Sequence, residues 1–161
     1  MEAALDLACS QLRSEIHYLT DGEVRIVCCH SGKVWDAYTG KAFDRISQFP
    51  RHDQAHQRWR LVCVNVGLRL FEITSPYCGL LADVYHQETG RGVNLVLFHR
   101  NNGDHQRFVF EKTQREREYF IRAWHSNLHL DVQGSGQGNH APIIQWELHG
   151  GANQRFRVER Y

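Results

Sequence analysis

The amino-acid sequence predicts an all-β fold in which twelve short strands form three pseudo-symmetric repeats. Three markers recur along the 161 residues with a shared period of about 48 residues. A glutamine stands two positions before an aromatic residue, at Gln57, Gln106 and Gln154. An aspartate follows a short apolar run at Asp36, Asp83 and Asp131, and an aromatic residue lies eight positions before each glutamine, at Phe49, Phe98 and Trp146. Because the three markers are independent, their common period indicates a threefold duplication.

Each repeat contains four segments with β-type patterns, separated by turn residues such as Ser31-Gly32 and Gly150-Gly151. In the first repeat the predicted strands are Val24–Cys29, Val34–Tyr38, Arg45–Phe49 and Arg58–Val64. In the second they are Leu68–Thr74, Leu80–Tyr85, Asn94–Phe98 and Arg107–Lys112. In the third they are Tyr119–Trp124, Leu128–Val132, Ile143–Glu147 and Arg155–Arg160.

The presence of three repeats distinguishes between the folds that are built from repeats of this length. A propeller needs about four blades to close, and a solenoid needs atypical capping repeats, whereas here the third repeat ends with the same motif as the others. Twelve strands in three equivalent groups therefore predict a β-trefoil, a closed barrel with a cap. We expect one domain over residues 21–161, with repeats at about 21–66, 67–114 and 115–161. Residues 1–20 form an extension in which Leu5, Ala8, Leu12 and Ile16 have the spacing of a short helix.

The charge and the cysteine content argue against a nucleic-acid-binding protein, a secreted protein and a membrane protein. Nineteen basic and eighteen acidic residues give a formal charge of +1, which provides no long-range attraction to nucleic acid or to an acidic membrane. Glu2 and Asp6 stand where a secretory signal would carry basic residues, and no apolar run is long enough to span a membrane. The five cysteines are odd in number and do not follow the repeat, so we expect reduced thiols, mostly filling the core of a cytoplasmic protein.

The motif at the end of each repeat resembles that of the ricin B-chain-like (QxW) β-trefoil lectins, and especially the leaderless mushroom agglutinins. The resemblance covers residues 22–161 and is clearest over residues 142–156, which look like the closing half of a repeat in those proteins. Two features depart from the family pattern. Phenylalanine replaces tryptophan at Phe108 and Phe156, and Ser47, Val96 and Ile144 stand where such chains often carry a glutamine. We expect Trp59, Phe108 and Phe156 to fill the core and not to contact a ligand.

The resemblance implies non-catalytic carbohydrate binding at up to three sites. A sugar is recognised by an acceptor-only anion, an amide or imidazole and a flat apolar surface. In such a site the aspartate takes two hydroxyls, the aromatic residue stacks on the ring, the residue before the glutamine bonds a hydroxyl, and the glutamine supports the loop. The residues are Asp131, Trp146, Asn153 and Gln154 in the third repeat, Asp83, Phe98, His105 and Gln106 in the second, and Asp36, Phe49, His56 and Gln57 in the first.

We expect the third site to bind best and the first to bind least. Tryptophan offers the largest stacking surface, and Asn153 is the amide that the resemblance implies. The first repeat has two fewer residues between its aspartate and its aromatic residue, and Pro50 stiffens the loop that follows. By resemblance, the partners are glycans, with galactose-type sugars favoured. Several weak sites on one chain, or on a homodimer, would raise the avidity for a glycan-covered surface.

Other interpretations of the same residues stay open. An isolated aspartate after a strand is often only a turn residue that accepts backbone N–H bonds. A β-trefoil that has lost sugar binding could instead bind proteins through its loops, as a protease inhibitor or an adaptor does. We expect no catalytic site, cofactor or metal, because the sequence contains none of the usual nucleophile, phosphate-loop or zinc motifs.

Overall fold

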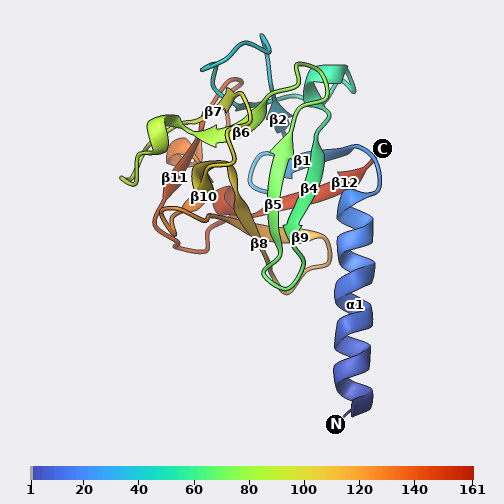
Figure 1. The fold of residues 1–161 in the computed structure, drawn as a ribbon. Helices are drawn as coiled ribbons and strands as arrows, with labels where there is room; N and C mark the ends of the chain where they lie inside the picture. Colours follow the sequence, from blue (N-terminus) through green and yellow to red (C-terminus); the bar gives the residue numbers. More distant parts are fainter. Residues whose placement is uncertain (1) are drawn as a thin grey trace.

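The computed structural model describes residues 2–161 and contains one long helix and twelve short strands (Figure 1). The helix is α1 (Glu2–Thr20). The strands of the first repeat are β1 (Val24–Cys28), β2 (Val34–Asp36), β3 (Ser47–Phe49) and β4 (Arg60–Asn65). Those of the second are β5 (Leu70–Thr74), β6 (Leu81–Val84), β7 (Leu95–Phe98) and β8 (Phe108–Lys112). Those of the third are β9 (Glu118–Ala123), β10 (His129–Val132), β11 (Ile143–Trp146) and β12 (Phe156–Arg160). The predicted all-β trefoil is confirmed, and each predicted strand overlaps an observed one.

The first and last strands of the repeats form a six-stranded antiparallel barrel. β1 pairs with β12, β4 with β5 and β8 with β9, and these pairs are joined by β12 to β9 and by β5 to β8. A bridge between Val24 and Trp59 completes the ring between β1 and the start of β4. Since the barrel closes, its strands leave few unpaired edges.

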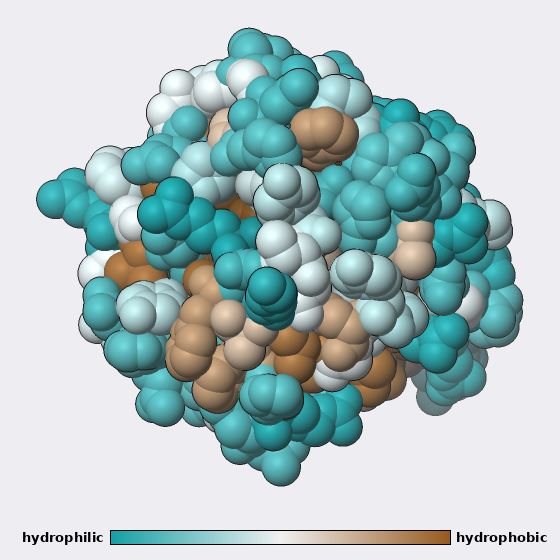
Figure 2. Space-filling view, turned by 90° about the horizontal axis from the view of Figure 1, so that it is seen from above, coloured by the Kyte–Doolittle hydropathy of each residue, from teal (hydrophilic) through white to brown (hydrophobic). Residues whose placement is uncertain are grey.

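The two middle strands of each repeat form a hairpin that belongs to the cap. The hairpins are β2 with β3, β6 with β7 and β10 with β11. Single bridges connect them in a ring, between Arg45 and Val96, between Asn94 and Ile144, and between Pro142 and Ser47. The loops of one repeat therefore lie directly against the cap hairpin of the next. Figure 2 looks down on the molecule of Figure 1 from above and shows a mostly hydrophilic face in which some hydrophobic residues are grouped together.

The aromatic residue of the repeated motif fills the core, as predicted. Trp59, Phe108 and Phe156 are fully buried. Trp35 packs edge-on against Trp59 and Phe156, with ring centroids 6.1 and 5.4 Å apart. The indole N–H of Trp59 donates to the carbonyl oxygen of Trp35 at 3.1 Å, which satisfies a donor that burial removes from water.

The N-terminal helix is longer than the short helix that we predicted, because it runs for 19 residues. Only its last turns contact the barrel. Ile16 and Leu19 are buried there, and Glu15 pairs with Arg69 and Lys112 at 3.0 and 3.3 Å. The first turns extend away from the barrel (Figure 1), and Leu5 is exposed. Within residues 2–161 no helix is both long enough and apolar enough to span a membrane.

Three of the five cysteines contact the hydrophobic core, as predicted: Cys28 is buried in it, and Cys63 and Cys78 pack against it. All five are free thiols, but only Cys28 is fully buried, while Cys9 is exposed and the other three are half-buried. Cys29 follows the end of β1, where its thiol donates to Glu118 at 3.3 Å, and partial burial raises its pKa to about 11. Cys9 lies in α1, Cys63 lies within β4 and Cys28 ends β1, so the cysteines do not follow the repeat.

Candidate functional site

One buried glutamine in each repeat connects the parts of a candidate site. We call Gln57, Gln106 and Gln154 the bracing glutamines, Asp36, Asp83 and Asp131 the site aspartates, and Phe49, Phe98 and Trp146 the platform aromatics. Each bracing glutamine is fully buried and donates from Nε2 to Oδ2 of its site aspartate, at 2.9, 2.8 and 3.0 Å in repeat order. The resemblance to the lectins implied this supporting role.

The same glutamine also fixes the loop that follows the platform aromatic. Its Nε2 donates to the carbonyl oxygen of the next residue, which is Pro50, His99 or Glu147, at 2.9, 2.8 and 2.7 Å. Its Oε1 accepts the backbone N–H of His52, Asn101 or His149, at 3.0, 3.0 and 2.8 Å. The first repeat makes the same bonds as the others, so Pro50 does not disturb this arrangement. In all three repeats the aspartate and the platform are held at a fixed relative position.

The third repeat places its predicted residues around one open pocket. Asp131, Trp146 and Asn153 line this pocket of about 340 Å³, and the bracing glutamine lies beneath the aspartate. Trp146 is 37% exposed, so its indole can meet a ligand, whereas Asp131 is buried at the base. The amide of Asn153 donates to Oδ1 of Asp131 at 3.0 Å and to the carbonyl of Val132 at 3.2 Å.

His149 belongs to this pocket as well and was not predicted from the sequence. Its Nε2 lies 3.4 Å from Oδ2 of Asp131. Burial raises the pKa of Asp131, and its contacts with Gln154, His149 and Asn153 oppose that rise only in part. His149 stands three residues after the platform aromatic, which is the one sequence signal that could have identified it.

The second repeat forms a pocket of the same volume, about 340 Å³, lined by Asp83, Phe98 and His105. Nε2 of His105 lies 3.3 Å from Oδ2 of Asp83. Burial lowers the pKa of His105 and raises the pKa of Asp83, although each group partly stabilises the charge of the other. The imidazole of His105 is therefore favoured in its neutral form, in which it can both donate and accept a hydrogen bond. Phe43, from the first repeat, also lines this pocket and was not predicted.

The first repeat brings its residues together in a different way. Oδ1 of Asp36 accepts the backbone N–H of Tyr38 at 2.6 Å, which is the turn contact that we considered for an isolated aspartate. Its Oδ2 lies 3.7 Å from Nε2 of His52 and 3.7 Å from Nε2 of His56. The imidazole of His140, from the third repeat, packs on Phe49 with ring centroids 4.9 Å apart. One face of this platform is therefore covered.

A loop of the preceding repeat places one residue beside each platform aromatic. These residues are Phe43, Gly92 and His140, whose N–H groups donate at 2.8 Å to the carbonyl oxygens of Leu97, Gln145 and Gln48. All three have a positive φ, of 69°, 81° and 67°. Phe43 packs on Phe98 as His140 packs on Phe49, whereas Gly92 places no side chain on Trp146. The third platform is exposed, and the side chain near it is that of Arg91, whose guanidinium lies 5.4 Å from the centroid of the Trp146 ring.

The chain is similar to known proteins in sequence and in fold. A family profile described as "Ricin-type beta-trefoil lectin domain-like" matches residues 11–98 and 104–161. No curated protein sequence matches this chain. Among solved structures, the designed threefold symmetric protein ThreeFoil is similar, with a TM-score of 0.83, 26% identity, and coverage of 87% of this chain and 99% of that protein.

Two natural proteins are also similar. An exo-β-1,3-galactanase from Clostridium thermocellum matches with a TM-score of 0.80 and 25% identity over 87% of this chain, which spans only 30% of the enzyme. The Macrolepiota procera ricin B-like lectin, solved in complex with lactose, matches with a TM-score of 0.74 and 19% identity, over 88% of this chain and 97% of the lectin. At that identity the last match supports the fold alone.

Proposed function

Because the chain belongs to the ricin-type β-trefoil lectin-domain-like family, we propose that it is a non-catalytic lectin whose main glycan site is the pocket of the third repeat. Membership in the family supports carbohydrate binding in general. The observation that carries the specific proposal is that Asp131 and Trp146 line one open pocket. A carboxylate and an exposed indole that line one cavity can bind the hydroxyls and the C–H face of a single sugar ring.

Each group in this pocket has a defined role. Asp131, when ionised, only accepts hydrogen bonds, so it selects hydroxyls that donate. Both amide hydrogens of Asn153 are used within the protein, and its Oδ1 is therefore the atom offered to a sugar hydroxyl. Trp146 provides the stacking surface, and His149 adds a polar ring on the rim of the pocket. Gln154 stays buried beneath Asp131 and acts only by positioning it.

We propose the second repeat as a further, weaker site. Asp83, Phe98 and His105 repeat the arrangement, but phenylalanine offers a smaller surface than tryptophan, and Phe43 covers one of its faces. The first repeat is the least suited to a sugar, because two imidazoles, of His52 and His56, face the carboxylate of Asp36 and His140 covers Phe49.

Galactose-containing glycans are the first ligands to test, because a lectin of the same fold was solved with lactose. Neutral hydrogen bonds contribute about 0.5–1.5 kcal/mol each and bonds to a carboxylate about 1.5–3 kcal/mol, so a site with only a few such bonds should bind weakly. Two sites on one rigid chain, or a homodimer of such chains, would then supply the avidity for a glycan-covered surface.

The test is a glycan array followed by calorimetric titration of the best saccharide into the protein and two variants. We expect Trp146→Ala to lose binding at the third site. Leu148→Ala is the matched control, since Leu148 is an exposed apolar residue two positions away that does not line the pocket. Unchanged binding by Trp146→Ala would overturn the site, and an array without any saccharide dependence would favour a protein-binding trefoil.

A further inference from the structure

The first repeat differs from the other two at the positions that face the site aspartate. These positions lie three and seven residues after the platform aromatic. They hold His52 and His56 in the first repeat, Asn101 and His105 in the second, and His149 and Asn153 in the third. Only the first repeat therefore directs two imidazoles at its carboxylate.

The geometry of the first repeat brings three metal-binding atoms together. One ligand atom from each of Asp36, His52 and His56 lies within 4.8 Å of the others. Each Nε2 is 3.7 Å from Oδ2 of Asp36. Ligands of a tetrahedral zinc ion, at roughly 2.0–2.2 Å from the metal, are about 3.3–3.6 Å apart. Small rotations of the two partly exposed rings would close the remaining gap.

We propose that Asp36, His52 and His56 bind a divalent transition-metal ion of the zinc class, with a fourth coordination position open to water. Two imidazoles and one carboxylate are the donors that zinc prefers in proteins. Calcium is disfavoured here, since it requires six to eight oxygen ligands. From the sequence we expect no metal, because it contains none of the usual zinc motifs. This proposal does not depend on sugar binding at the other two repeats.

Contacts around the ligands hold the carboxylate in place. Oδ2 of Asp36 accepts from Gln57 at 2.9 Å, and Oδ1 accepts from the N–H of Tyr38 at 2.6 Å. A carboxylate oxygen has two lone pairs, so Oδ2 keeps one for a metal. Hydrogen bonds of this kind orient metal ligands and increase affinity, because the group does not have to be ordered on binding.

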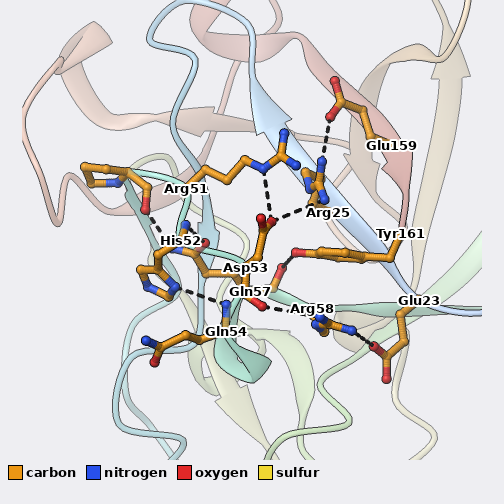
Figure 3. Close-up of polar contacts among 11 residues, drawn as sticks. Glu23, Arg25, Arg51, His52, Asp53, Gln54, Gln57, Arg58, Glu159 and Tyr161 are labelled. Atoms are coloured by element: carbon orange, nitrogen blue, oxygen red, sulfur yellow. Dashed lines mark hydrogen bonds and ion pairs between the residues drawn. The ribbon is translucent and has the colours of Figure 1, made fainter.

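The loop that carries both histidines is also fixed to the barrel. Figure 3 shows Asp53 between two arginines, accepting from Arg25 at 3.3 Å and from Arg51 at 3.0 Å. In the same view, Tyr161 donates to the carbonyl of Gln57 at 3.4 Å. The two histidines thus stand on a loop with several attachments on either side of them.

One contact changes when the metal binds. The backbone N–H of Gln54 donates to Nδ1 of His52 at 3.2 Å, so the proton of that ring lies on Nε2. Binding of a metal at Nε2 moves this proton to Nδ1 and releases the Gln54 N–H. That group is at an exposed position, where water can replace the lost acceptor. The metal therefore displaces one solvent-accessible hydrogen bond and leaves the buried contacts of Asp36 intact.

The experiment is calorimetric titration of ZnCl2 into the full chain at neutral pH, with CaCl2 as the comparison ion. We expect saturable binding of zinc, and no binding of calcium at this site. His52→Asn and His56→Asn place in the first repeat the residues that the second and third repeats carry naturally, so both variants should fold. Each should weaken zinc binding by at least about tenfold. Zinc should raise the midpoint of thermal unfolding of the wild type and not that of the variants.

The five free cysteines can also bind zinc, and both histidine variants retain all of them. Loss of affinity in these variants therefore reports on the imidazoles alone. Asn101→His supplies the second repeat with the missing imidazole and should add a further zinc equivalent. The proposal is overturned if the wild type binds no zinc, or if His52→Asn and His56→Asn bind it with unchanged affinity while circular dichroism shows the native fold.

Discussion

The imidazole of His140 packs against the ring of Phe49, with planes inclined at 36° and centroids 4.9 Å apart. In the third repeat, Gly92 occupies the equivalent place beside Trp146 and has no side chain to cover the indole. Three repeats with nearly the same backbone thus present platforms of different accessibility. The residue that sets this difference comes from the loop of the preceding repeat in each case.

Gly92→His should lower glycan affinity at the third site, because it copies the arrangement of the first repeat. A Cβ at Gly92 would lie 3.7 Å from the indole, in ordinary contact, and the imidazole beyond it would cover part of the stacking surface. The φ of +81° also disfavours any side chain, at a cost of roughly 1–2 kcal/mol. Saccharide titration and urea unfolding measure the two effects separately.

Gly90→His is the matched control for that substitution. Gly90 lies in the same loop, and a Cβ there meets no atom within 4 Å. We expect it to leave glycan binding unchanged. Equal losses of affinity in the two variants would mean that the loop, and not coverage of Trp146, controls the site.

Gln154→Ala should destabilise the fold and abolish binding at the third site. The amide of Gln154 bonds Asp131, the carbonyl of Glu147 and the N–H of His149, and its loss leaves buried groups without partners. We expect about 2–4 kcal/mol of lost stability in urea unfolding. Replacement of the exposed Gln114 by alanine should change stability by no more than about 0.5 kcal/mol. Native stability in Gln154→Ala would contradict the bracing role.

Binding at the third site should weaken on acidification at a higher pH than an ordinary carboxyl would cause. The sugar hydroxyls donate to the ionised form of Asp131, and burial raises the pKa of this group. A raised pKa means that the carboxylate takes up its proton earlier as the pH falls from 7. The affinity should therefore decline with a midpoint above about 3.9, the usual value for aspartate. A midpoint at or below that value, with the fold intact by circular dichroism, would show that Asp131 is not the titrating group.

Much of this structure follows from the repeat period. The period identifies the twelve strands and the core positions Trp59, Phe108 and Phe156, because burial in a threefold barrel is imposed on every copy alike. It also brings each site aspartate together with its platform aromatic. The strand ends shift by one or two residues, since loop geometry and not hydrophobic pattern decides where pairing stops.

The loop contacts, the residues beside the platforms and the helix could not be predicted from the period. The contacts of His149 with Asp131 and of His52 with Asp36 depend on the path of a loop that carries no regular pattern. The residues beside the platforms come from the preceding repeat, so their role depends on how neighbouring repeats pack. The length of α1 could not be predicted from the period either, because residues 2–20 lie outside the repeat.

Trp59→Phe should be tolerated, since the other two repeats carry phenylalanine at this core position. The variant keeps the aromatic packing but loses the bond from the indole N–H to Trp35. We expect a loss of about 1–2 kcal/mol in urea unfolding. Phe156→Ala removes the whole ring from the same core and should cost about 3–5 kcal/mol. If Trp59→Phe lost as much unfolding free energy as Phe156→Ala, phenylalanine would not serve at position 59 as it does at 108 and 156. The three positions would then not be equivalent.

The most direct measurement is a crystal structure of the chain with its best-binding saccharide from the glycan array. We predict one sugar ring stacked on the indole of Trp146, with two of its hydroxyls donating to the carboxylate of Asp131. A saccharide bound elsewhere, with this pocket filled only by water, would contradict the assignment.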